Sequence, residues 1–141
     1  MLRVAMDTST LVGAVLHAQS VPHRAWLYAQ QSSVLIASRA TFDEIGRVFR
    51  RERLIRYVHT ETRDEFLALY RISVDWVDVT KEDLAAVEPS CRDPKDNIFL
   101  ALAQVGGADI LVSSDQGLLV LHPWRGVAIL TPAQFLAQIE I

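Results

Sequence analysis

The sequence is poor in cysteine, with only Cys91 among its 141 residues. A disulfide within the chain and a four-cysteine zinc site are therefore excluded, and a lone thiol fits the reducing conditions of the cytoplasm. No apolar run reaches the roughly 18 residues that a transmembrane helix needs. The apolar start of the chain is interrupted by Asp7, too early for a signal peptide. We therefore expect a cytoplasmic protein without a membrane partner.

Positive charge is also scarce, since 14 Lys and Arg residues stand against 17 Asp and Glu residues, for a formal net charge of −3. This balance disfavours a strongly basic nucleic-acid binder. The sequence contains neither a GxxxxGK phosphate loop nor a GxSxG nucleophile elbow, which removes two common classes of α/β enzyme. A phosphatase of the haloacid-dehalogenase type would need an Asp at position 9, where this chain has Ser9. The four histidines show no metal-ligand spacing, so a zinc site is not expected.

The sequence does contain a regular alternation of short apolar runs and segments with helical periodicity, and 50% of its residues are hydrophobic. The length fits a single domain over residues 1–141. Apolar runs separated by helices predict a parallel sheet covered on both faces, in a three-layer α/β/α domain. Strands are expected at residues 2–6, 34–37, 74–79, 110–113 and 127–130. Helices are expected at residues 10–17, 22–31, 38–51, 61–72 and 93–105, with two more beginning at Thr80 and at Thr131–Pro132.

Four acidic residues fall where predicted strands end or where the following helices begin. They are Asp7 after the first strand, Asp115 after the fourth, and Glu44 and Asp96 in the first turns of two helices. Because these ends meet at one edge of a parallel sheet, where ligands bind, we expect the four carboxylates to converge there. Carboxylates that lie so close together repel one another unless a cation neutralises them. Hard oxygen ligands of this kind suit Mg²⁺ or Mn²⁺. Such a site can bring water and phosphate together for phosphodiester hydrolysis.

Each of these acids also has a purely structural explanation. Glu44 lies at capping-box spacing from Thr41, and Asp96 stands at a helix start, where the helix dipole favours an acid. Asp115 could begin a tight turn. Asp7 is the hardest to explain in this way, because an unpaired carboxylate at the end of a buried strand is costly. The coincidence of all four acids at one edge favours a functional site.

The residues around these acids resemble the motifs of the PIN domain, a nuclease family that includes toxins of the VapC kind. The similar segments are residues 7–12 (DTSTLV), Ser38 followed by Glu44, residues 92–97 (RDPKDN) and residues 107–115 (GADILVSSD). The resemblance covers essentially the whole chain. It implies a five-stranded parallel sheet in the order 3-2-1-4-5 and RNA cleavage that depends on Mg²⁺ or Mn²⁺. It also implies that Asp7, Asp96 and Asp115 hold the metal, while Glu44 ligates it or orients a water.

Two supporting positions depart from the pattern of this family. Ser9 stands where relatives usually carry Asn, and Ser113 stands where they usually carry Thr. The hydroxyl of Ser9 can still bond a neighbouring carboxylate or a water, and Ser113 keeps the hydroxyl that Thr would carry, so we expect the site to survive. The alternative is a catalytically weakened PIN-like module that binds RNA or acts as a scaffold. Asp93 can either cap the helix that starts at Pro94 or reach the metal, and the proline favours the cap.

Five arginines fall within ten residues, and three of them, Arg47, Arg50 and Arg51, share one face of the predicted helix. The resemblance suggests that Arg47 and Arg51 contact RNA phosphates. A solvated helix end explains the same pattern, and the sequence does not decide between the two. The resemblance further implies an antitoxin protein that blocks the site, and a homodimer.

The remaining aromatic and thiol groups are expected to be structural. Trp26, Trp76 and Trp124 are predicted to lie in the core or at an interface rather than to stack on nucleic-acid bases. Cys91 has no base partner in the sequence, which predicts an unreactive thiol.

Overall fold

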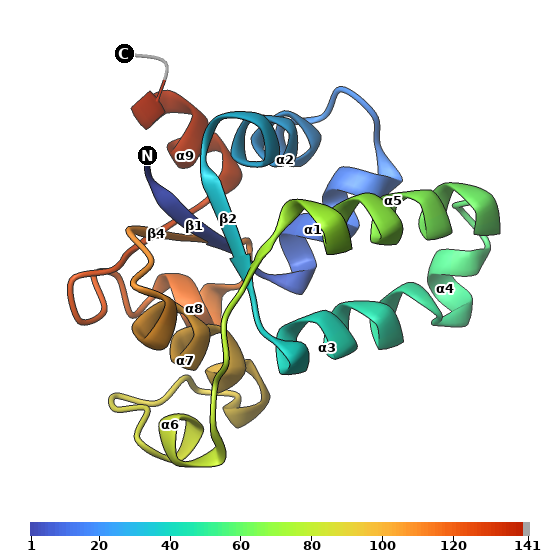
Figure 1. The fold of residues 1–141 in the computed structure, drawn as a ribbon. Coiled ribbons are helices and arrows are strands. Elements are labelled where there is room, and N and C mark those ends of the chain that lie inside the picture. The colour runs from blue at the N-terminus through green and yellow to red at the C-terminus, as the bar shows by residue number, and fades with distance from the viewer. Residues whose placement is uncertain (140–141) are drawn as a thin grey trace.

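The strands form one all-parallel sheet in the computed structural model, which describes residues 1–139. The order across the sheet is β3-β2-β1-β4-β5, so β1 is central (Figure 1). The strands are β1 (Arg3–Met6), β2 (Val34–Ala37), β3 (Asp75–Trp76), β4 (Ile110–Val112) and β5 (Ala128–Leu130). The predicted fold class and strand order are confirmed.

Helices connect the strands and cover both faces of the sheet (Figure 1). They are α1 (Thr8–Leu16), α2 (Val21–Ser32), α3 (Arg39–Phe49), α4 (Glu52–Ile55), α5 (Thr60–Ser73), α6 (Lys81–Ala85), the 3₁₀ turn η1 (Pro94–Asp96), α7 (Asn97–Gly106), α8 (Gln116–Leu119) and α9 (Pro132–Ile139). Among the described residues, no helix is both long and apolar enough to cross a membrane.

Two hydrophobic cores lie on opposite faces of the sheet. Successive strand residues alternate between them, so that Val4 and Met6 of β1 join one core and Ala5 joins the other. The first core is completed by α1, α2, α3, α5 and α9, and the second by α7 and α8. Because both faces are covered, the strands read as continuous apolar runs, which is why the sequence identifies them so clearly.

Polar side chains fix the points where the helices begin. Asp7 caps α1 by accepting from the backbone N–H of Thr10, and Ser38 caps α3 in a reciprocal capping box with Thr41. Asp93 accepts from the backbone N–H of Lys95, so the cap favoured by the sequence is present. The capping-box explanation of Glu44 is wrong, since Ser38 and Thr41 form the box without it. Its carboxylate is therefore available for another contact.

The structure departs from the sequence predictions mainly at the ends of elements. The predicted strand at residues 74–79 is reduced to Asp75–Trp76, because β3 lies at the sheet edge and pairs only with β2. The helix predicted to run to residue 51 ends at Phe49, and the chain turns into the short α4, which was not predicted. The short α8 was also not predicted. The helix predicted from residue 93 begins as a 3₁₀ turn.

Candidate active site

The four acids predicted to converge do line one cavity, of about 520 Å³, at the carboxyl edge of the sheet. Each arrives from a different element: Asp7 from the end of β1, Glu44 from α3, Asp96 from the end of η1, and Asp115 from the cap of α8. Ser9, Asp93 and Arg51, which the sequence also singled out, line the same cavity. The topology thus brings together residues that are more than a hundred positions apart in the chain.

Asp7 is the most deeply held of these acids, with only 3% of its surface exposed. Its carboxylate accepts from the backbone N–H of Thr10 at 2.9 Å and from the hydroxyl of Ser9 at 2.9 Å. The hydroxyl of Ser113 donates a short hydrogen bond to the other carboxylate oxygen. Burial nevertheless raises the pKa of Asp7 above its ordinary value, and the hydrogen bonds offset this only in part.

Ser9 and Ser113, the two departures from the family pattern, therefore both serve the same carboxylate. Ser113 is fully buried, and its oxygen also accepts the backbone N–H of Asp115 at 2.9 Å. One hydroxyl thus links the acid at the end of β1 with the acid after β4. This contact holds the Asp7 carboxylate at a fixed place relative to the backbone at Asp115.

Asp96 and Asp115 form a close pair of like-charged groups in the cavity. One carboxylate oxygen from each and the Sγ atom of Cys91 all lie within 4.8 Å of one another. The pKa of Asp96 is raised to about 7, first by burial, then by its contact with Asp115 and by the negative charges of Asp115, Asp93 and Glu44. A proton or a cation is needed here to hold the carboxylates together.

Glu44 is oriented by a residue that the sequence did not single out. The hydroxyl of Thr8, at the start of α1, donates to the Glu44 carboxylate at 2.6 Å. This bond ties α1 to α3 at the cavity, which Thr8 and Glu44 both line. The only sequence signal for Thr8 was its place in the segment that follows Asp7.

Cys91 lies beside the acids, but its surroundings make the thiol unreactive. The thiol is buried and donates to the carbonyl oxygen of Gly117 at 3.2 Å, and burial raises its pKa. Gly117 leaves room for this arrangement, because a Cβ there would come within 3.2 Å of a carboxylate oxygen of Asp115. The position of the thiol next to Asp96 and Asp115 was not predicted from the sequence.

Cationic side chains border the acidic cavity. Arg51 and Lys95 line it directly, whereas Arg47 lines an adjoining cavity of about 420 Å³ that shares Glu44 and Lys95 with the first. Arg47 and Arg51 are separated by the end of α3 rather than lying on one continuous helix. Lys95 was missed as a candidate, although it directly precedes Asp96 in the sequence.

The donor chemistry of this cavity fits a divalent cation. Four carboxylates converge, and the raised pKa values of Asp7 and Asp96 mean that their charged forms lack compensation in the protein alone. Oxygen donors of this kind match Mg²⁺ or Mn²⁺. A bound cation would replace the proton that Asp96 otherwise retains near neutral pH.

Comparison with known proteins relates this chain to a single fold. A family model for the PIN domain matches residues 3–117. A search of curated proteins gave no match.

Among solved structures, PAE2754 from Pyrobaculum aerophilum is similar over 99% of this chain and 91% of its own, with 18% identity and a TM-score of 0.66. VapBC2 from Rickettsia felis, bound to a DNA fragment from the promoter, matches 91% of this chain and 97% of its own, with 10% identity and a TM-score of 0.64. The sarcin-ricin loop cleaving toxin VapC20 from Mycobacterium tuberculosis matches 89% of this chain and 98% of its own, with 16% identity and a TM-score of 0.57. At these identities the similarity concerns the fold.

Proposed function

The chain belongs to the PIN domain family, and from this premise we propose that it is a metal-dependent ribonuclease, the toxin of a toxin–antitoxin pair. The observation that carries the proposal is the convergence of Asp7, Glu44, Asp96 and Asp115 on one cavity. The fold shared with VapC20, a toxin that cleaves the sarcin-ricin loop, supports RNA as the substrate. The fold shared with VapBC2 supports the pairing with an antitoxin.

In this proposal Asp7, Asp96 and Asp115 hold Mg²⁺ or Mn²⁺, and Glu44 ligates the ion or orients a water. When bound, such an ion lowers the pKa of a coordinated water and neutralises charge on the phosphate. Ser9 and Ser113 hold the Asp7 carboxylate in place. Thr8 does the same for Glu44. A preorganised carboxylate loses less free energy when the substrate arrives, because it need not reorient.

The RNA backbone is proposed to approach along the cationic border of the cavity. Arg51 and Lys95 at the cavity, and Arg47 beside it, are placed to contact phosphates. An antitoxin that covers this border would block the enzyme. We further propose that the protein acts in the cytoplasm and forms a homodimer, as the resemblance to VapC toxins implies.

A weakened, non-catalytic PIN module is the alternative raised by Ser9. The contacts favour the enzyme, because the Ser9 hydroxyl reaches both carboxylate oxygens of Asp7, at 2.9 and 3.0 Å. The hydroxyl also accepts the backbone N–H of Ser114 at 3.3 Å. Ser9 thus orients the first acid, so its presence gives no reason to expect loss of activity.

The proposal is tested by RNA cleavage with purified protein in Mg²⁺ or Mn²⁺ and again in EDTA. The wild type should cleave only with the metal, and Asp96→Asn should be slower by roughly 100-fold or more, because it loses a ligand. Asp64→Asn, a change of the same kind at an exposed position of α5, should cleave like the wild type. Equal cleavage by Asp96→Asn, or cleavage in EDTA, would contradict the proposal.

A further inference from the structure

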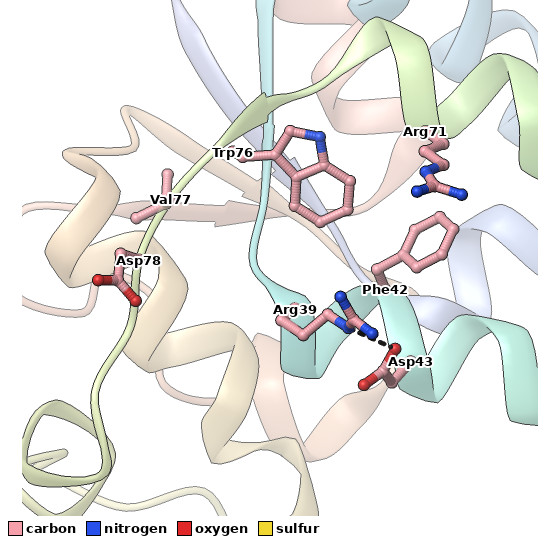
Figure 2. Close-up of a pocket in the computed structure, with 7 residues that line it drawn as sticks. All are labelled: Arg39, Phe42, Asp43, Arg71, Trp76, Val77 and Asp78. Carbon is pink, nitrogen blue, oxygen red and sulfur yellow. Dashed lines mark hydrogen bonds and ion pairs between the residues drawn. The ribbon is translucent and has the colours of Figure 1, made fainter.

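A third cavity, of about 440 Å³, opens at the sheet edge beside β3 (Figure 2). Its volume lies within the range of small-ligand sites. It is built from the first turns of α3, the last turn of α5 and the chain through and after β3. The residues that line it are Arg39, Phe42, Asp43, Arg71, Trp76, Val77 and Asp78.

Trp76 sets this cavity apart from the rest of the molecule. Trp26 and Trp124 lie in the core as predicted, with 2% and 1% of their surfaces exposed, whereas Trp76 is 46% exposed and does not lie in the core. Its ring is supported edge to face by Phe42, with centroids 5.5 Å apart, and Phe42 in turn stacks on the buried Tyr70. A large aromatic side chain that is rigidly supported and left open to solvent is a platform on which a flat ligand can stack.

The charged groups of the cavity indicate what kind of flat ligand fits. Figure 2 shows Arg39 and Asp43 on α3 on one side of the aromatic rings and Arg71 on another. Arg39 donates to Asp43 at 3.2 Å, which leaves a hydrogen-bonding pair at the rim. Guanidinium planes stack on heteroaromatic rings, while carboxylates accept hydrogen bonds from ring amino and imino groups. The charges of the two arginines and two aspartates cancel, and Arg39 is already paired with Asp43, so the cavity suits a neutral nucleobase better than a phosphate group.

The cavity is joined to the candidate active site along α3. The adjoining cavity that contains Arg47 shares Asp43 with the Trp76 cavity and shares Glu44 and Lys95 with the acidic cavity. Arg39 and Glu44 are separated by five residues of helix, a rise of about 7.5 Å. A short run of nucleotides can span this distance, with its phosphates beside Arg47 and Lys95.

We infer that the Trp76 cavity binds one unpaired base of the RNA substrate, stacked on Trp76, while Arg47 and Lys95 guide the backbone toward the acids. The inference rests on the proposed ribonuclease function and adds a base-binding subsite to it. The three cavities share lining residues along α3, a succession that favours an extended RNA over a protein partner. Four of the seven lining residues are charged, whereas the buried centre of a protein interface is depleted in charged residues.

The inference is tested by RNA binding in EDTA at low salt, where the proposed cleavage is off and electrostatic contacts are strongest. The probe is a single-stranded RNA of mixed sequence, together with a set in which one base at a time is replaced by an abasic site. Removal of the base that occupies the cavity should weaken binding by the wild type roughly 5- to 150-fold, the range for stacking on an aromatic side chain. The Trp76→Ala variant should bind intact RNA more weakly than the wild type by a similar factor. Its affinity should not fall further with that abasic probe.

Control variants separate the subsite from a general effect on folding. Trp76→Phe keeps a ring and should retain most of the position-specific effect. Ile72→Ala changes an apolar residue that is 81% exposed next to Arg71 and does not line the cavity, so it should bind like the wild type. Should Trp76→Ala melt at the assay temperature, Arg71→Ala at the exposed rim should reduce the same position-specific effect several-fold.

The outcomes distinguish this inference from the proposed function. If the wild type cleaves RNA with metal but no abasic position and no Trp76 variant changes binding, the subsite is wrong and the ribonuclease assignment stands. If Trp76→Ala weakens binding of an antitoxin and leaves RNA binding unchanged, the cavity is a protein-docking site and the inference is overturned. If the wild type neither binds nor cleaves RNA, both fail.

Discussion

One carboxylate oxygen of Asp96 and one of Asp115 lie within 4.8 Å of each other, although the two residues belong to different elements, η1 and the cap of α8. This closeness contributes to a raised pKa of about 7 for Asp96. The protein alone thus holds Asp96 partly protonated near neutral pH. In the proposed enzyme, Asp96 and Asp115 would hold a divalent cation, whose charge would serve in place of that proton.

The first prediction concerns stability against pH in EDTA. The pKa of Asp96 is about 7 in the folded protein, against an ordinary value of 3.8 for an aspartate. Between these values the folded state binds a proton that the unfolded state has lost, so the contribution of Asp96 to stability falls as pH rises through this window. Asp7 acts in the same direction. The Tm of Asp96→Asn should therefore increase relative to that of the wild type from about pH 4 to about pH 7.

Thermal melts of both proteins at each pH measure this difference in Tm. Subtracting one Tm from the other cancels the effect of the titratable groups that both proteins share. Saturating Mg²⁺ should stabilise the wild type above that window and leave Asp96→Asn much less affected, since ligand binding to the folded state raises Tm. A Tm difference that is constant with pH in EDTA would contradict the raised pKa.

The second prediction concerns Ser113, which positions Asp7. Ser113→Ala removes the hydroxyl that donates to Asp7 and accepts from the backbone of Asp115. We expect cleavage to fall roughly 10- to 100-fold, as for loss of a hydrogen bond that orients a metal ligand. Ser113→Thr keeps the hydroxyl and should retain activity. The apparent affinity for Mn²⁺ should weaken in the alanine variant only, and equal affinities in both variants would argue against this role.

The third prediction concerns Thr8, which holds Glu44 at 2.6 Å. Thr8→Val preserves the shape of the side chain and removes the donor. Because the Glu44 carboxylate then loses its orientation, we expect kcat to fall by about 10-fold, the size of one hydrogen bond to a charged group. Thr8→Ser should restore the rate. If Thr8→Val cleaves at the wild-type rate while Glu44→Gln is inactive, the contact has no part in positioning Glu44.

The fourth prediction concerns the cationic border of the cavity. RNA affinity falls with salt concentration, and the steepness is the slope of log affinity against log salt concentration. In the double variant Arg47→Ala/Arg51→Ala this slope should become shallower by about 0.7 for each phosphate that the protein no longer neutralises, the value for single strands. Arg56→Ala is the matched control, since Arg56 lines none of these three cavities and forms an exposed ion pair with Glu52. An unchanged slope in the double variant would mean that neither arginine neutralises a phosphate.

The sequence predicts the sheet well because both of its faces are buried. Residues that alternate between two cores, such as Val4 and Ala5, must all be apolar, so each strand is visible as a run. The edge strand β3 is the exception. It pairs on one side only and both its residues are exposed, so its short length could not be read from apolar residues.

The acids of the site are predictable because parallel topology brings strand ends to one edge. The side chains that orient these acids are harder to predict from the sequence. A hydroxyl such as that of Thr8 has many structural uses at a helix start, and only the packing of α1 against α3 brings it to Glu44. Likewise, the exposure of Trp76 depends on its place at the sheet edge and not on residues beside it in the sequence.

The most direct test of the central claim is a titration with Mn²⁺ in which binding to the protein and the rate of RNA cleavage are measured on the same sample. Cleavage should rise in proportion to occupancy of the site, and Asp96→Asn should lose both tight binding and cleavage, while Asp64→Asn keeps both. Cleavage that reaches its full rate without bound metal, or that survives in Asp96→Asn, would contradict the assignment of these acids to a metal-dependent ribonuclease site.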